Sequence, residues 1–134
     1  MKRYVLDASA LMAFFEREPG ADRVEGLLGA AAASHQPLLM SVVNWGEVYY
    51  SIWRKYGEDV ARRTLAEIAQ LPIELVDVDM ETTRLAASFK AKHKLPYADA
   101  FAAALAQQRK AILITVDKDF LQIEKQVSIL WPNA

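Results

Sequence analysis

The feature that most constrains the fold is a regular alternation of short apolar segments with longer stretches of helical periodicity. Each apolar segment is only three or four residues long. This alternation favours βαβ units, because two parallel strands need a long crossover, which is usually a helix. Helices then cover both faces of the sheet, and its strands become short continuous apolar runs. We therefore predict an α/β fold with a central parallel sheet formed by residues 4–6, 38–40, 73–76, 111–114 and 127–130.

The segments between these strands have the spacing of amphipathic helices. Residues 42–56 show it most clearly, with a wide apolar stripe that includes Trp45 and Ile52 and with Gly57 as a terminator. We find no repeat, linker or low-complexity tract, so residues 1–134 are expected to form a single domain. The predicted helices cover residues 10–17, 21–32, 42–56, 58–70, 80–93 and 97–109, with one further helical turn from residue 117.

Composition excludes several kinds of site. Lys and Arg total 16 and Asp and Glu total 17, so the overall charge does not indicate nucleic-acid binding, which would need a local basic patch. The absence of cysteine excludes disulfides and thiolate metal sites, and His35 and His93 are too far apart in sequence to suggest a zinc site. No apolar run reaches the ~18 residues of a membrane span, and the N-terminus lacks a signal-peptide pattern. We expect a cytoplasmic protein that does not enter membranes.

Four acidic residues lie where a parallel sheet would bring them together. Asp7 ends the first strand, Glu47 lies on the helix after the second, and Asp99 and Asp117 flank the fourth. The carboxyl ends of parallel strands share one edge, which is where open α/β sheets bind ligands. Converging carboxylates repel one another unless a cation neutralises them, and oxygen ligands favour Mg²⁺ or Mn²⁺. Such a site suits hydrolysis of a phosphodiester bond.

Neighbouring polar residues are candidates for orienting these acids. Ser9 and Thr115 lie at the ends of the first and fourth strands, and Asn44 lies one helical turn before Glu47. Each residue also has a purely structural interpretation. Asp7, Asp99 and Asp117 could serve only as helix caps or first-turn residues, and Asn44 and Glu47 could belong to a solvated helix face.

Aromatic residues on the first and third predicted helices suggest a surface for a partner. Phe14, Tyr49 and Trp53 would line a groove that accepts an amphipathic helix, although they could equally be core residues. The lysines at positions 90, 92 and 94 form a basic end to a helix, which is either solvated or in contact with an RNA backbone.

Taken together, four motifs in this order and at this spacing resemble the PIN-domain ribonucleases, and most of all the VapC-type toxins of toxin–antitoxin modules. The resemblance covers essentially the full chain. The motifs are Val5-Leu6-Asp7-Ala8-Ser9, Ser41 through Glu47, Pro96-Tyr97-Ala98-Asp99-Ala100, and Thr115-Val116-Asp117-Lys118-Asp119-Phe120.

The resemblance implies a PIN-like three-layer sandwich with strand order 3-2-1-4-5. It implies a Mg²⁺- or Mn²⁺-dependent endoribonuclease that acts as the toxin of a toxin–antitoxin pair, forms a homodimer and is blocked by a VapB-type antitoxin. It assigns catalysis to Asp7, Glu47, Asp99 and Asp117. It assigns metal binding to Asp7, Asp99, Asp117 and Asp119, and it leaves open whether Asp117 or Asp119 is the fourth ligand.

Other families fit less well. A phosphatase of the haloacid-dehalogenase type would need a second aspartate where Ser9 stands, and a response-regulator receiver would need paired acids near the first strand, where only Asp7 is present. A binding module without catalytic activity remains a different alternative, in which the acids are unrelated surface residues with negligible affinity for Mn²⁺.

Overall fold

The computed structural model describes residues 2–134 and shows a five-stranded parallel sheet between two layers of helices. The strand order is β3-β2-β1-β4-β5, which confirms the order that the resemblance implies. The strands are β1 (Tyr4–Leu6), β2 (Leu38–Ser41), β3 (Ile73–Val76), β4 (Ile112–Ile114) and β5 (Ile129–Leu130).

The helices occupy the stretches that the sequence predicts. The first begins earlier than predicted because Asp7 caps it directly after β1, and β5 is two residues shorter than predicted. The elements are α1 (Ala8–Phe15), α2 (Ala21–Ser34), α3 (Val42–Tyr56), α4 (Glu58–Gln70), α5 (Met80–Lys92), α6 (Tyr97–Arg109) and the 3₁₀ helix η1 (Lys118–Ile123).

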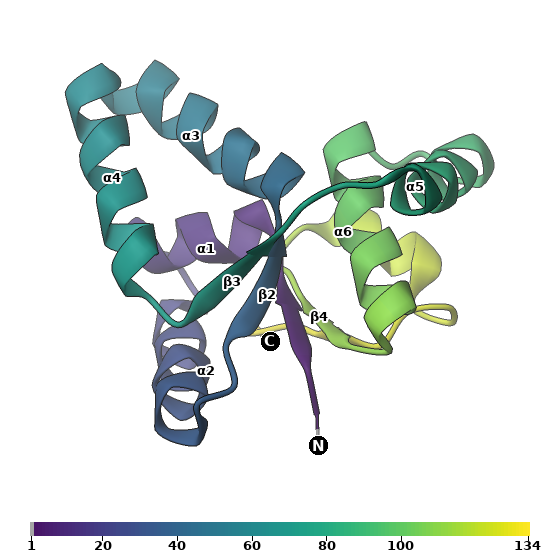
Figure 1. Ribbon diagram of the computed structural model, residues 1–134, viewed down its shortest axis with the longest axis horizontal. Helices are drawn as coiled ribbons and strands as arrows, with labels where there is room; N and C mark the ends of the chain where they lie inside the picture. Colours follow the sequence, from purple (N-terminus) through teal and green to yellow (C-terminus); the bar gives the residue numbers. More distant parts are fainter. Residues whose placement is uncertain (1) are drawn as a thin grey trace.

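The two layers follow from the alternation of side chains along each strand. In β1, Val5 faces the layer of α5, α6 and η1, and Leu6 faces the layer of α1 to α4. Leu113 and Ile114 of β4 repeat this alternation. Figure 1 shows α1 to α4 on one side of the sheet and α5 and α6 on the other.

The helix α6 forms the centre of one layer. Its residues from Asp99 to Ala106 are all buried, and most of them are alanines. Small side chains let this helix lie close to the sheet and to α5, with which it makes its most extensive packing. As a result Asp99 enters the molecule with its helix and does not remain on the surface.

Chain direction brings the acidic residues to one edge. From β1 the chain moves outward to β2 and β3, and then it returns to β4 on the other side of β1. The neighbours β1 and β4 therefore form a topological switch point, where loops diverge and leave room for a ligand. Within the described residues, no helix combines the length and apolar character needed to cross a membrane.

Candidate active site

The structure brings Asp7, Glu47, Asp99 and Asp117 together at the carboxyl edge of the sheet. Asp7 follows β1, Asp117 follows β4, and Asp99 and Glu47 approach from helices on opposite faces. Burial and then the Asp117 carboxyl raise the pKa of Asp99, and the charges of Asp7 and Glu47 add smaller effects in the same direction, as expected for four neighbouring carboxyls.

Asp7 is the most completely bonded of the four acids. Its Oδ1 accepts hydrogen bonds from the Ala10 backbone N–H and the Ser9 hydroxyl, both at 2.9 Å, and its Oδ2 accepts one from the Thr115 hydroxyl at 2.6 Å. Asp7 therefore does cap α1. Burial nevertheless raises the pKa of Asp7 to about 7, and its hydrogen bonds offset only part of that effect.

The hydroxyls of Ser9 and Thr115 join the ends of β1 and β4. They lie 3.1 Å apart, and Ser9 also accepts a hydrogen bond from the Val116 backbone N–H at 3.1 Å. Thr115 accepts one from the Asp117 backbone N–H at 3.0 Å. The same two hydroxyls thus hold the Asp7 carboxylate and the turn that carries Asp117.

Asp99 is buried and incompletely bonded. The residue is 6% exposed, and its Oδ2 has no hydrogen-bond partner among the described residues. Burial, followed by the proximity of the Asp117 carboxyl, raises the pKa of Asp99 to about 8. An unpaired buried carboxylate oxygen beside other carboxyls is costly without a cation, and a cation would remove the cost.

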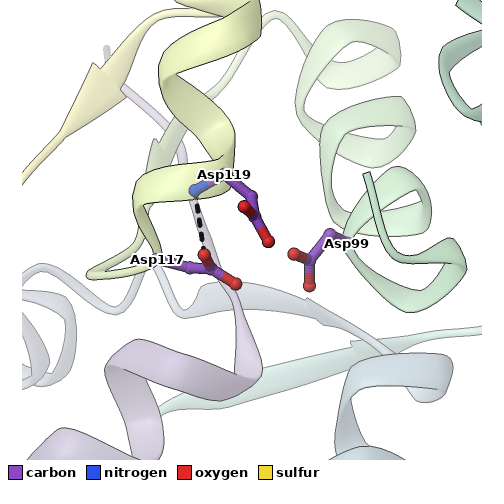
Figure 2. A group of neighbouring side chains, drawn as sticks. All are labelled: Asp99, Asp117 and Asp119. Carbon is purple, nitrogen blue, oxygen red and sulfur yellow. Dashed lines mark hydrogen bonds between the residues drawn. The ribbon is translucent and has the colours of Figure 1, made fainter. Parts of the chain in front are cut away.

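Among the described residues, Asp99, Asp117 and Asp119 form an acidic group that could hold a metal ion. Each offers one oxygen, and these three oxygens lie within 4.8 Å of one another. Figure 2 shows their carboxylates converging from α6 and from the start of η1. Asp117 also caps η1, because its Oδ1 accepts a hydrogen bond from the Asp119 backbone N–H at 2.9 Å. Asp7 borders this group and is not part of it.

Asn44 and Glu47 connect α3 to the same site. Asn44 is fully buried, and its amide donates hydrogen bonds to the Ala98 carbonyl at 3.1 Å and to Glu47 Oε1 at 3.3 Å. Glu47 is half-buried, and burial raises its pKa. The alternative that these two residues belong to a solvated helix face is therefore wrong, because α6 packs against that side of α3.

The proposed partner groove is only partly a surface. Phe14 and Tyr49 are half-buried and pack against the core under α1 to α4, whereas Trp53 is 43% exposed. Trp45, Tyr49 and Trp53 form a ladder along α3, with ring centroids 6.1 Å and 5.5 Å apart. Aromatic side chains thus extend outward along α3 from the helical turn that holds Glu47.

The basic end of α5 is only partly available for a ligand. The Lys90 ammonium donates a hydrogen bond to the Leu95 carbonyl at 2.8 Å, so it serves the connection between α5 and α6. Lys92 and Lys94 are exposed.

Comparison with known proteins decides the family. The family described as PIN domain matches residues 4–126, which is most of the chain. The chain belongs to the PIN-domain family. No curated protein sequence gives a significant match.

Solved structures show the same PIN fold at low sequence identity. A toxin–antitoxin complex from Klebsiella pneumoniae is 21% identical, with a TM-score of 0.66 and 98% of each chain covered. DNA-bound VapBC from Salmonella typhimurium is 13% identical, with a TM-score of 0.75 over 97% of this chain and 98% of that one. VapC20 from Mycobacterium tuberculosis, described as a sarcin-ricin loop cleaving toxin, is 20% identical, with a TM-score of 0.69 over 89% and 93%.

Proposed function

We propose that this PIN domain is a Mg²⁺- or Mn²⁺-dependent endoribonuclease and the toxin of a toxin–antitoxin pair. The observation that carries the proposal is the convergence of four carboxyls at the switch point, with one buried oxygen of Asp99 unpaired. The family match and the fold shared with toxin–antitoxin proteins support it.

The residues present fit a hard divalent cation. Asp99, Asp117 and Asp119 supply oxygen ligands from two elements, and the exposed Asp119 leaves one side of the group open to solvent. Asp7 adds negative charge beside them, and its hydroxyl partners fix its orientation. We assign Asp7, Asp99, Asp117 and Asp119 to the metal site on these grounds.

The bound cation would supply charge neutralisation at the scissile phosphate and would ease deprotonation of the attacking water. The chain's own residues would do the rest. Asp99 and Asp117 would fix the site between α6 and η1, and Asn44 would hold Glu47 against it. The raised pKa of Glu47 makes its carboxylate a better proton acceptor, so we assign it the role of general base.

Partners follow from the same proposal. We expect an RNA substrate, a homodimer and a VapB-type antitoxin, in the cytoplasm. We expect the antitoxin to place an amphipathic helix against Phe14, Tyr49 and Trp53 and to reach the acids along α3. An arginine at the end of that segment would pair with the carboxylates and compete with the metal.

Cleavage of RNA by the purified protein tests the proposed function. We expect cleavage with Mg²⁺ or Mn²⁺, none in EDTA, and a loss of at least about 100-fold in Asp99→Asn. Asp77→Asn is a matched control, because Asp77 is an exposed aspartate in the loop after β3. Undiminished cleavage in EDTA, or in Asp99→Asn, would contradict the metal mechanism.

A further inference from the structure

One side chain outside the acidic group ties together the two elements that carry it. Gln122 lies in η1, and its Oε1 accepts a hydrogen bond from the Lys94 backbone N–H at 2.9 Å. Its Nε2 donates to the Lys94 carbonyl at 3.3 Å and to the Asp119 carbonyl at 3.0 Å. A single amide therefore bonds to both backbone groups of Lys94 and to the backbone of a proposed metal ligand.

The positions of these residues give the contact its significance. Lys94 lies in the connection from α5 to α6, two residues before Pro96, which caps α6, and Asp99 is in the first turn of that helix. Asp119 is in the first turn of η1. The amide of Gln122, which is exposed, thus bridges the connection before α6 and the start of η1.

The rest of η1 is held differently. Phe120 and Ile123 are fully buried in the cluster that contains α6, so burial of apolar surface keeps η1 on the sheet. Burial of apolar surface has no preferred direction, so small shifts of η1 along the surface it covers cost little free energy. Hydrogen bonds, by contrast, fix the distance and direction between the groups they join. Apolar burial alone would therefore leave the distance between η1 and α6, and with it the distance between Asp119 and Asp99, open to small changes.

We propose that Gln122 is a positioning residue that holds Asp119 at metal-binding distance from Asp99. The proposal rests on the proposed function, because it deepens the description of the same metal site. Gln122 does not touch the cation or the substrate. It acts through the backbone of Asp119 and the connection before α6.

Mn²⁺ affinity, measured by isothermal titration calorimetry, tests the positioning role. Gln122→Met keeps the length of the side chain and loses its hydrogen bonds. We expect Mn²⁺ to bind about 3- to 10-fold more weakly, which is less than the 10- to 100-fold typical of a residue bonded directly to a metal ligand. Gln126→Met is the matched control, because Gln126 is an exposed glutamine near η1 whose amide, among the described residues, makes a single long contact of 3.5 Å with His93. We expect the Mn²⁺ affinity of Gln126→Met to stay within twofold of wild type.

A coupled variant separates positioning from general loosening. In an Asp119→Asn background, Gln122→Met should cause no further loss of Mn²⁺ affinity, because the group that Gln122 positions has lost its charge. Equal losses in Gln122→Met and Gln126→Met, or an undiminished loss in the Asp119→Asn background, would overturn the proposal.

Amide exchange tests the contact without metal. The Lys94 N–H should exchange with deuterium about tenfold faster in Gln122→Met than in wild type, because it has lost its acceptor. An unchanged exchange rate would overturn the proposal even if the protein binds Mn²⁺. Failure of wild type to bind Mn²⁺, with the exchange effect present, would instead contradict the proposed function.

Discussion

Replacing Asp99 by asparagine should stabilise the metal-free protein at pH 8. Asp99 is buried, and one of its carboxyl oxygens has no partner. Its pKa rises from 3.8 to about 8, so the folded protein binds a proton that the unfolded chain releases. Asparagine removes the ionisable group, and its amide can donate a hydrogen bond toward the adjacent carboxylate of Asp117.

The size of the effect follows from the shifted pKa. One pKa unit corresponds to ~1.4 kcal/mol, so the difference between 3.8 and about 8 sets an upper limit of ~6 kcal/mol at pH 8. Part of this penalty is mutual repulsion with Asp117, and the buried asparagine has polar atoms of its own to satisfy, so we expect a net gain of ~1–3 kcal/mol. For a chain of this length, that gain raises Tm by ~4–10 °C.

Thermal unfolding in EDTA, followed by circular dichroism, measures this gain. The sign is set by linkage. A carboxyl whose pKa is higher in the folded protein than in the unfolded chain contributes fully to folding stability below its pKa in the unfolded chain. That contribution is lost as the pH rises through its pKa in the folded protein. The advantage of Asp99→Asn over wild type should therefore be small near pH 4 and grow toward pH 8. Asp77→Asn should show no such pH-dependent gain. A lower Tm for Asp99→Asn at pH 8, or an advantage that does not vary with pH, would contradict the raised pKa of Asp99 and favour a role confined to the start of α6.

Three further predictions use other parts of the site. The Tm of wild type in EDTA should fall between pH 5 and pH 8, because burial also raises the pKa of Asp7 to about 7. Mn²⁺ should reduce that fall, and a Tm that is constant across this pH range would contradict the raised pKa values. Thr115→Val should lower the free energy of unfolding, measured in urea, by ~1–3 kcal/mol, because Asp7 Oδ2 and the Asp117 N–H both lose a hydrogen-bond partner. Thr83→Val, at a less buried hydroxyl, should lower it by less, and equal losses in the two variants would argue against the buried network. Trp53→Ala should fold and keep basal RNA cleavage but resist inhibition by the cognate antitoxin, and unchanged inhibition would place the antitoxin elsewhere.

Local sequence patterns predict much of this architecture because they have local causes. The strands are predicted by short continuous apolar runs and the helices by the period of 3.6, and Gly57 ends α3 where the sequence indicates. The position of Asp7 and Asp117 at strand ends follows from the strand assignment alone. The strand order does not, because it depends on which faces pack together, and here only the family resemblance supplied it.

The residues that connect different elements could not be predicted in full. Asn44 follows helical periodicity onto the polar side of α3, but α6 covers that side and buries it. Gln122 carries no signal in the sequence, because an exposed glutamine in a short helix is ordinary and its partner at Lys94 is 28 residues away. The number of oxygens that Asp7 can offer to a metal likewise depends on the hydroxyls of Ser9 and Thr115 beside it.

Anomalous diffraction from crystals of the protein grown with Mn²⁺ would locate the metal site itself. We expect a Mn²⁺ peak between α6 and η1, with carboxylate oxygens of Asp99 and Asp117 as ligands at ~2.0–2.3 Å and Asp119 or Asp7 beside them. The peak should be absent in Asp99→Asn and present in Asp77→Asn. A map without a peak at this position, at a Mn²⁺ concentration that supports RNA cleavage, would show that these carboxylates do not hold the catalytic metal.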